Sequence, residues 1–443
     1  MKRLLKGGRL VDPSQGIDGI RDVLIDGERV VRVGVGLPPD ETAGATIVEV
    51  PPGWVVCPGL IDMHVHLREP GQEHKETIAT GAAAAAAGGF TAVACMPNTD
   101  PVNDEASVTR YIVQKAAEAG SVRVYPIGAI SKGSKGEQLA EMADLKAAGC
   151  VAFSDDGRPV ASALLMRRAL EYAGMVGLPV IDHCEEPSLK GEGVAHEGRV
   201  ASVLGLRGIP AAAEEIMVAR DAILAGMTGG RLHIAHLSSR GSLDLVLAAK
   251  TRGVRVTCEV TPHHLVLTDE RLSTPVAYDT NLKMNPPLRE PSDRDALVAG
   301  VADGTVDAIA TDHAPHHLDD KYVEFDRAPF GIVGLETAIS LMLDRLVHPG
   351  IIPLARLVEV CSINPARILG VGGGTLAPGS PADVTILAPD EKVVVRRELF
   401  RSKSRNTPFD GWELRGAVAA TFVGGRTVFV NEAVRGAEVF HKA

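Results

Sequence analysis

The chain of 443 residues has few cysteines and no long apolar runs. Its six cysteines are scattered and include no CxxC pair, which excludes the dense disulfide framework of small secreted domains. No apolar run approaches the roughly 18 residues that a membrane helix needs. Gly7 and Gly8 follow the first residues before a signal-peptide core could form. We therefore expect a cytoplasmic protein with reduced, buried cysteines and no membrane partner.

Clusters of basic residues are also missing. The chain has 46 Lys and Arg against 56 Asp and Glu, a formal net charge of −10. Because nucleic-acid surfaces rely on clustered Lys and Arg, we expect no nucleic-acid partner. A small anionic substrate bound by one local arginine is compatible with this composition.

Short β-branched runs alternate with Ala- and Leu-rich stretches along most of the chain, a pattern typical of parallel βαβ units. The strand-like runs are Leu60–His66, Phe90–Met96, Val122–Ile127, Cys150–Asp155, Leu178–His183, Arg231–His236, Val254–Val260 and Val306–Thr311. The helix-like stretches between them are Thr77–Ala87, Ala106–Ala119, Glu137–Ala148, Ala163–Val176, Ala213–Ala225, Gly241–Thr251 and Pro291–Val301. Eight strands with these spacers predict an α/β fold of the TIM (β/α)8 barrel type.

Both chain ends have a different, β-rich pattern. Leu24–Val30 contains a strand, an Asp-Gly turn and a second strand, and Asp383–Leu387 and Arg426–Val430 also predict strands. Each end is too short to bury a sheet face alone, so we expect the two ends to pair in one small β-rich domain. The predicted division is 1–53 and 369–443 for this domain and 54–368 for the barrel.

Histidine and aspartate residues stand where the predicted barrel strands end. In His64-Val65-His66 both imidazoles point to one face and can chelate zinc, although an HxH pair alone is equally compatible with barrel packing. The other strand ends carry Asp155, Asp156, His183, His236 and Asp312. Catalytic residues of TIM barrels gather at this rim, so the set predicts a metal site.

The alternation of side chains along a strand indicates which of two nearby histidines faces the barrel interior. His233 and His236 are an odd number of residues apart, so only one of them is expected to face the barrel interior. We assign this orientation to His236 and expect His233 to be a packed or hydrogen-bonded outer residue. His263 and His264 are interpreted as loop residues or as outer supports of the site.

The number of ligands exceeds the needs of one metal ion. A catalytic zinc takes three protein ligands and a water, whereas four histidines and two carboxylates are available here. Two metal ions sharing a bridge fit better, and a water between them would lose a proton near neutral pH and act as the nucleophile.

Several segments resemble the bacterial type I dihydroorotases of the amidohydrolase superfamily, in the same order along the chain. The opening segment is Asp62–Gly71, with the sequence DMHVHLREPG. The others are Met96–Thr99, Phe153–Gly157, His183–Glu186, His236–Ser238, Lys283–Arg289, Ala310–His316, Pro329–Gly331 and Ser404–Phe409. The resemblance covers nearly the whole chain and implies a zinc-dependent hydrolase that interconverts dihydroorotate and N-carbamoyl-aspartate.

The resemblance also implies roles for single residues. His64, His66 and Asp312 would hold one zinc ion, and His183 and His236 the other. Asp156, or alternatively Asp155, would bridge the two ions in place of the carboxylated lysine of many relatives. Asp312 would transfer the proton.

Substrate contacts follow from the same resemblance. Arg68, Asn98 and His316 would bind the substrate carboxylate, while Asn285 and the backbone of Phe330 and Gly331 would contact the amide groups of the ring. A homodimer, associated in some relatives with an aspartate transcarbamoylase, is the implied assembly.

Two other functions are compatible with parts of this pattern. A hydantoinase or allantoinase would use the same scaffold, but such enzymes usually carry the strand-four lysine that is absent here. A non-catalytic dihydroorotase-like subunit that scaffolds a transcarbamoylase would lose metal ligands, whereas every ligand position is present. The polar segment that begins at His317 is predicted to be a mobile loop or lid.

Overall fold

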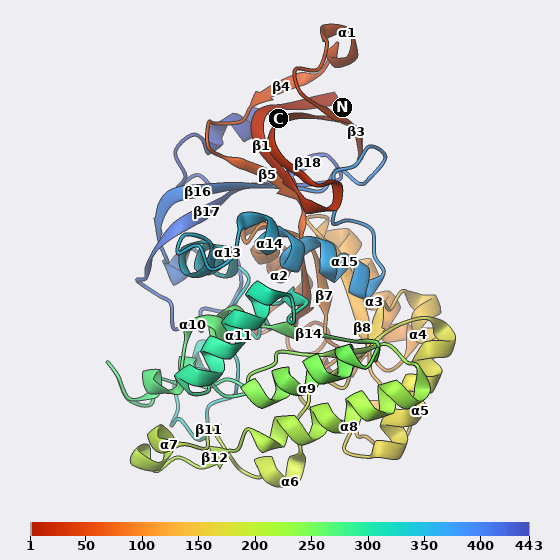
Figure 1. Cartoon of the computed structure of the whole chain (residues 1–443), viewed down its shortest axis with the longest axis vertical. Helices are drawn as coiled ribbons and strands as arrows, with labels where there is room; N and C mark the ends of the chain where they lie inside the picture. The colour runs from red at the N-terminus through yellow and green to blue at the C-terminus, as the bar shows by residue number, and fades with distance from the viewer. Residues whose placement is uncertain (1, 443) are drawn as a thin grey trace.

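The computed structural model describes residues 2–442 and contains a barrel and a separate sheet built from both chain ends (Figure 1). The terminal sheet stands above the barrel in Figure 1, and both chain ends lie in its upper part. The predicted TIM barrel with a β-rich terminal sheet is confirmed. No helix among the described residues is long and apolar enough to cross a membrane.

The barrel consists of eight parallel strands that follow one another in sequence order. They are β6 (Leu60–Val65), β7 (Phe90–Cys95), β8 (Arg123–Gly128), β9 (Ala152–Phe153), β10 (Val180–Asp182), β13 (Leu232–Ile234), β14 (Val256–Val260) and β15 (Ala308–Ile309). A parallel bridge between Val65 and His313, with a 2.8 Å hydrogen bond from His66 N to His313 O, joins the first strand to the chain that follows the last. This contact closes the barrel at the rim.

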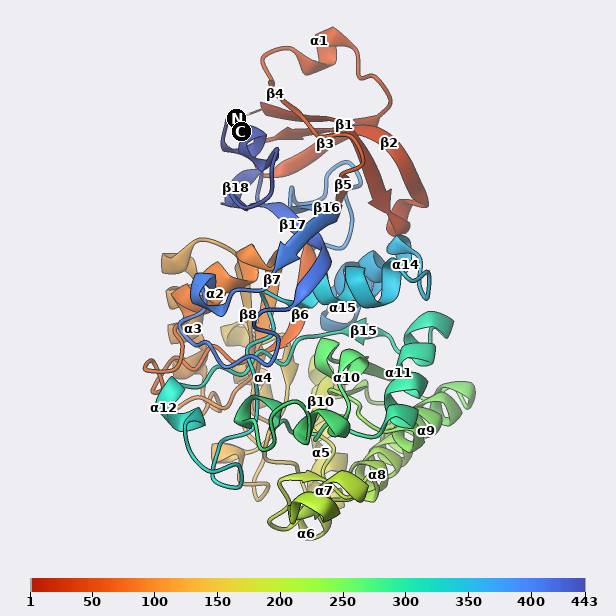
Figure 2. The same ribbon diagram turned by 90° about the vertical axis from the view of Figure 1, so that its left-hand side faces the viewer.

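Helices cover the outside of the barrel, and α8 and α9 lie side by side across it (Figures 1 and 2). The helices that follow the strands are α2 (Ile78–Ala87), α3 (Ala106–Ala119), α4 (Met142–Ala148), α5 (Ala163–Val176), α8 (Ala212–Thr228), α9 (Arg240–Thr251) and α11 (Pro291–Asp303). Thr77 forms a capping box with Thr80 at the start of α2. The small side chains of α2 let it pack closely, and the Thr421 hydroxyl of the terminal sheet donates to Ala86 O at 2.8 Å.

Shorter elements lie in the loops at the carboxyl ends of the strands. They are α6 (Pro187–Lys190), β11 (Ala195–His196), α7 (Arg199–Leu204), β12 (Gly208–Ile209), α10 (Pro262–Val266) and α12 (Leu318–Lys321). After the barrel the chain forms α13 (Ala338–Met342), α14 (Leu354–Val358) and α15 (Asn364–Leu369). The polar segment predicted as a loop or lid therefore contains a short helix, α12.

An apolar layer fills the barrel below the rim. Ile61, Ala92, Ile181 and other inward residues of the strands form one buried cluster, to which α15 adds Ile368 and Leu369. The barrel is therefore a packed core, and polar groups are left to its carboxyl end.

The terminal sheet contains strands from both ends of the chain. They are β1 (Lys2–Asp12), β2 (Ile17–Asp26), β3 (Arg29–Gly34), β4 (Thr46–Glu49), β5 (Val55–Pro58), β16 (Val384–Val394), β17 (Glu413–Val423) and β18 (Arg426–Val430). The two ends meet where β5 pairs with β16 in antiparallel fashion, so the predicted pairing of the ends is confirmed.

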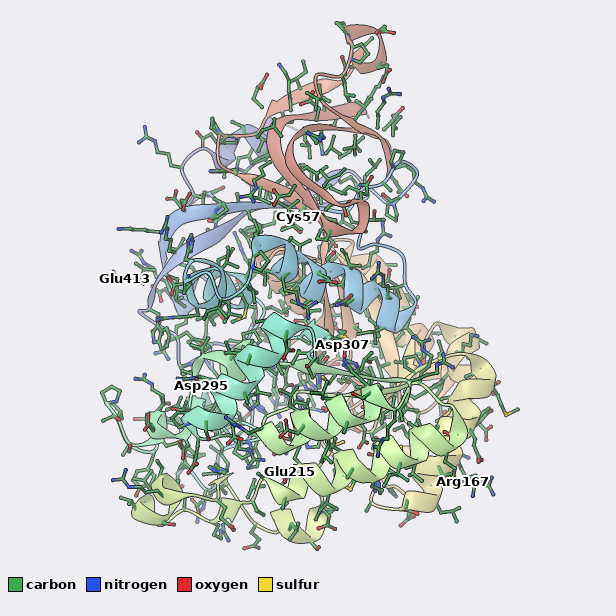
Figure 3. The ribbon with its side chains drawn as sticks, viewed as in Figure 1. Cys57, Arg167, Glu215, Asp295, Asp307 and Glu413 are labelled. Carbon is green, nitrogen blue, oxygen red and sulfur yellow. The ribbon has the colours of Figure 1, made fainter. Side chains whose placement is uncertain are left out.

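The chain passes from the terminal sheet to the barrel directly after β5. That strand lies beyond residue 53, where the sequence places the boundary, and the predicted division of the chain remains a prediction. Cys57 in β5 is buried at this junction (Figure 3), with Sγ 3.4 Å from Thr385 O. All six cysteines are buried and unpaired, as expected.

One bidentate ion pair links the terminal sheet to the barrel. Arg123 of β8 donates from Nε and Nη2 to the Asp383 carboxylate at 2.7 and 3.1 Å, and this carboxylate also accepts from Gly424 N. Asp383 is buried, whereas the Arg123 side chain is about one third exposed.

We expect Asp383→Asn to lower the free energy of unfolding by about 1–2 kcal/mol, because asparagine fills the same space without the charge that pairs with Arg123. Urea denaturation measures this loss. The control is Asp18→Asn, which removes the exposed pair with Arg9 and should cost less than about 0.5 kcal/mol. Equal losses in the two variants would contradict a stabilising role for the buried pair.

Candidate metal and substrate site

The predicted metal ligands converge at the carboxyl rim of the barrel. His66 Nε2 lies 3.0 Å from Asp312 Oδ1, and His64 Nε2 lies 3.6 Å from the same oxygen. The pairing of β6 with β7 shifts in register between Asp62 and Val65, so β6 is irregular at the position of His64. His64, His66 and Asp312 together form one buried group with metal-binding geometry.

Asp156 occupies the centre of the histidine cluster. One of its carboxylate oxygens lies 3.4 Å from His64 Nε2 and 3.6 Å from both His183 Nδ1 and His236 Nε2, and the other lies 3.5 Å from His66 Nε2. Asp156, His64 and His236 form a second group with metal-binding geometry. The structure thus brings all six predicted ligands together.

Asp155 faces away from this cluster. Its carboxylate accepts hydrogen bonds from Ile130 N at 2.8 Å, from Ser131 N at 3.1 Å and from the Ser131 hydroxyl. These bonds fix the loop after β8. The geometry therefore favours Asp156 as the bridging carboxylate.

The cluster is strongly coupled electrostatically. Burial opposes ionisation of Asp156, but the charge of His64 and the close imidazoles of His183 and His236 hold its pKa well below the usual value. Burial likewise opposes protonation of His64, and the carboxylates of Asp156 and Glu259 raise its pKa well above the usual value. A buried carboxylate among imidazoles provides a site of strong attraction for cations.

Three of the four imidazoles are oriented by a partner on their outer nitrogen. His64 Nδ1 lies 2.7 Å from Glu259 Oε1, and His66 Nδ1 lies 2.8 Å from Asn98 Oδ1. His183 Nε2 lies 3.5 Å from Glu185 Oε2. Such partners fix the tautomer and the ring orientation of metal-binding histidines.

Glu259 and Glu185 were not predicted from the sequence. Glu259 is an ionised residue within the apolar run of β14, with its pKa lowered to about 2 because hydrogen bonds from His233 and His64 outweigh the cost of burial. The sequence did contain one signal for Glu259, because it is a charged residue inside a strand that was predicted to be buried. Glu185 lies two residues after His183 in the sequence but carried no separate signal.

The prediction that His233 faces outward is wrong. His233 is buried with Nε2 3.2 Å from Glu259 Oε2, the same carboxylate that contacts His64. The alternation rule allows only one of His233 and His236 to face inward if both lie on the same strand. However, β13 ends at Ile234, so the rule does not apply to His236. His236 has φ 32°, and this turn brings its side chain inward as well.

Backbone strain is concentrated at the rim. Five described residues other than glycine have positive φ, and three of them are Arg68 (61°), His236 (32°) and Asp312 (48°). Such conformations cost on the order of 1–3 kcal/mol each and persist where the surrounding structure imposes them.

The donor set fits metal ions. Imidazole nitrogens suit zinc, and carboxylates suit harder divalent cations as well. His64 Nε2 and Asp156 Oδ1 are buried without a hydrogen-bond partner among the described residues. Since buried polar atoms are normally paired, these two atoms point to a ligand between them.

Arg68 is a buried cation without a carboxylate partner. Its Nε donates to Pro315 O at 3.2 Å and its Nη2 lies 3.5 Å from His316 Nε2, and no ion pair within 4.0 Å involves it among residues 2–442. Burial lowers its pKa to about 10, against the raising effect of Asp312 and other carboxylates, so it is charged at neutral pH. A buried unpaired guanidinium favours an anionic ligand.

The other predicted substrate residues lie near Arg68 and the histidine cluster. His316 Nε2 lies 2.8 Å from Phe330 O, and Gly331 N donates to Lys283 O at 2.9 Å. Asn285 Nδ2 donates to Glu185 Oε2 at 3.3 Å, while its Oδ1 is buried without a partner among the described residues. Asn98 Oδ1 lies 2.8 Å from His66 Nδ1, so this residue, predicted to bind the substrate carboxylate, contacts a predicted metal ligand.

His263 and His264 are helical rather than loop residues. Both are buried in α10, and His264 Nε2 lies 3.0 Å from Pro286 O, next to Asn285 in the sequence. Burial first, and then the charge of His236, lowers the pKa of His264 to about 4. His264 is therefore neutral at physiological pH and supports the segment that carries Asn285.

Comparisons with known proteins agree with this geometry. A family model described as dihydro-orotase-like matches residues 53–242. Among solved structures, a dihydropyrimidinase from Brevibacillus agri superposes with a TM-score of 0.85 at 24% identity, over 98% of this chain and 96% of that one. The L-hydantoinase from Arthrobacter aurescens gives a TM-score of 0.85 at 25% identity, over 96% of each chain. These likenesses show the fold.

Sequence relatives are closer. The dihydroorotase of Pelotomaculum thermopropionicum is 55% identical over 435 residues, which cover 98% of this chain and 100% of the relative. The dihydroorotase of Geobacter sulfurreducens is 56% identical over 428 residues, 97% of this chain and 99% of the relative. Because this identity extends over nearly the full length of both partners, the chain belongs to the dihydroorotase family.

Proposed function

We propose that the chain is a dihydroorotase, which reversibly hydrolyses (S)-dihydroorotate to N-carbamoyl-L-aspartate in de novo pyrimidine biosynthesis. Full-length relatives of that name support the activity. The observation that carries the proposal is Arg68, a buried guanidinium without a carboxylate partner beside the histidine cluster. Dihydroorotate presents a carboxylate for that cation and a ring amide for the cluster.

The proposal includes two zinc ions per subunit. His64, His66 and Asp312 would hold one ion, His183 and His236 the other, and Asp156 would bridge them. Zinc would polarise the attacked carbonyl and lower the pKa of a water molecule. The unpartnered His64 Nε2 and Asp156 Oδ1 support this assignment.

Asp312 is the proposed proton carrier. Burial raises its pKa, but the hydrogen bond from His66 and the charge of His64 lower it below the usual value, so the carboxylate is ionised and can accept a proton from the attacking water. It then returns this proton to the ring nitrogen that leaves. In ring closure the same proton moves in the opposite direction.

The substrate would be fixed at both ends. Arg68, His316 and Asn98 would bind the carboxylate, and the unpartnered Oδ1 of Asn285 would accept a hydrogen bond from a ring N–H. The backbone of Phe330 and Gly331 would contact the opposite amide edge.

Ring opening of three substrates tests the proposed function. Metal-replete protein is incubated with dihydroorotate, hydantoin and allantoin, and the loss of each ring is followed. We expect turnover of dihydroorotate only, because hydantoin and allantoin have no carboxylate for Arg68. Opening of hydantoin or allantoin alone would favour another cyclic amidase, and a metal-loaded protein without any turnover would favour a scaffold subunit.

We expect Asp156→Ala to abolish turnover and to lower bound metal, because two cations a few ångströms apart would lose the anion that offsets their repulsion. Elemental analysis of purified protein measures the metal. Asp155→Asn is the matched control and should retain the metal, since Asp155 bonds to the loop at Ile130 and Ser131. Full metal content in Asp156→Ala would contradict the bridge.

Arg68→Lys should raise KM for dihydroorotate about tenfold or more, with the charge retained. An ammonium group cannot reproduce the planar two-bond contact of guanidinium with a carboxylate. Steady-state kinetics, with metal content checked in parallel, measure this effect. An unchanged KM would mean that Arg68 does not contact the substrate carboxylate.

A further inference from the structure

A segment of the C-terminal half leaves the terminal sheet and contacts the barrel rim. It comprises residues 395–412, between β16 and β17, and we call it the rim segment. Two carboxylates, that of the buried Glu76 and that of the half-buried Glu336, hold its middle. Glu76 accepts from the Ser402 hydroxyl and from Lys403 N at 3.0 Å, and Glu336 accepts from Arg401 N at 2.8 Å.

Asn406 of the rim segment bonds to two separate rim loops with one side chain. Its Oδ1 accepts from His316 N at 3.2 Å, and its Nδ2 donates to Ala314 O at 3.1 Å and to Gly331 O at 3.2 Å. Its backbone carbonyl accepts from Val333 N at 3.0 Å. The side chain is buried, with 5% of the residue exposed.

The two loops that Asn406 joins carry the proposed substrate contacts. The first contains His316 beside Arg68, and the second contains Phe330 and Gly331. A Cβ added to Gly331 would lie 2.5 Å from Ala314 Cβ, so the loops already touch and small shifts between them change the pocket.

We propose that Asn406 is a positioning residue for the substrate carboxylate pocket, in which its amide holds the His316 loop and the Phe330–Gly331 loop in register beside Arg68. The inference rests on the proposed function of dihydroorotate hydrolysis. Asn406 does not touch the predicted metal ligands in the hydrogen bonds described, so its effect falls on substrate binding.

An amide is required because the two loops present opposite groups. The backbone N–H of His316 needs an acceptor, whereas the carbonyls of Ala314 and Gly331 need a donor. An aspartate has the same shape but would place a negative oxygen against two carbonyls. The bonds of this side chain therefore depend on chemistry and not on volume alone.

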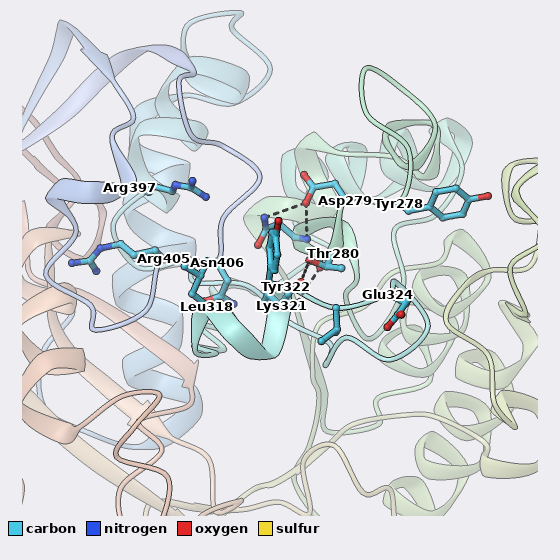
Figure 4. A pocket seen from close by; sticks show the side chains of 12 residues that line it. Tyr278, Asp279, Thr280, Leu318, Lys321, Tyr322, Glu324, Arg397, Arg405 and Asn406 are labelled. Atoms are coloured by element: carbon cyan, nitrogen blue, oxygen red, sulfur yellow. Dashed lines mark hydrogen bonds between the residues drawn. The ribbon is translucent and has the colours of Figure 1, made fainter.

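On the side of Asn406 that faces away from the two loops, no packed side chains among the described residues are available to hold the loops together if the amide is lost. Asn406 also lines a cavity of about 870 Å³, together with Thr280, Lys321 and Arg405 (Figure 4). In Figure 4 α12 lies between the rim segment and the segment of Asp279 and Thr280. Because open space borders this side, the loops are expected to separate when the hydrogen bonds are lost.

The test compares Asn406→Asp and Asn406→Ala with the wild-type protein, all metal-replete. We expect KM for dihydroorotate to rise at least about tenfold in both variants, with kcat reduced less than about threefold and metal content unchanged. The control is Ser404→Ala, which removes another bond of the rim segment, to Lys75 O at 2.7 Å, and should retain the wild-type KM. Thermal unfolding of each variant identifies any loss of the fold.

A double-variant cycle separates positioning from a purely structural role. If Asn406 acts through the carboxylate pocket, Asn406→Asp should raise KM much less in an Arg68→Lys background than in the wild type. Equal effects in the two backgrounds, or a wild-type KM in Asn406→Asp, would overturn the inference. A wild-type protein that does not open dihydroorotate would instead overturn the proposed function, and this inference with it.

Discussion

The rim depends on one buried anion, the carboxylate of Asp156, which lies 3.4–3.6 Å from nitrogens of four histidines. An uncompensated charge at this depth would cost several kcal/mol, so the imidazoles and the carboxylate must be held together by the fold. Parallel strands provide this arrangement because their carboxyl ends meet at one rim. The closing contact between His66 N and His313 O brings the first and last strands into the same ring.

Hydrogen bonds around the cluster fix the direction of each ligand. Glu259 contacts both His64 and His233, so one carboxylate of β14 links two other strands through their histidines. Asp62 has a similar role between β6 and the end of β15, because it accepts from His64 N and Thr311 N, each at 3.1 Å. Glu259 also accepts from the backbone N of His236 at 3.4 Å, where the positive φ turns this side chain inward.

Much of the fold was predictable because the barrel signal is local. Apolar runs and alanine-rich helices recur in order, and α3 and α5 match their predicted bounds. The positions of the predicted ligands at strand ends were predictable for the same reason. The inward direction of His236 was predicted, but that of His233 was not, because two inward histidines on one strand require β13 to end at Ile234 and His236 to adopt a positive φ. The supports Glu259 and Glu185 were also missed, since pairing across strands is set by tertiary structure and leaves no periodic pattern.

The position of Arg68 connects the metal cluster to the choice of substrate. The histidine and carboxylate cluster alone would suit many cyclic amides, and the solved hydantoinase and dihydropyrimidinase structures share the fold. A guanidinium that is buried without an acidic partner favours a negative group on the ligand, and in the proposed function that group is the carboxylate of dihydroorotate. The loops around it are held by the rim segment, which comes from the far end of the chain and is anchored by Glu76 and Glu336. Pairing of the two chain ends in the terminal sheet determines where that segment reaches the rim, so under the proposed function the sheet would contribute to selectivity.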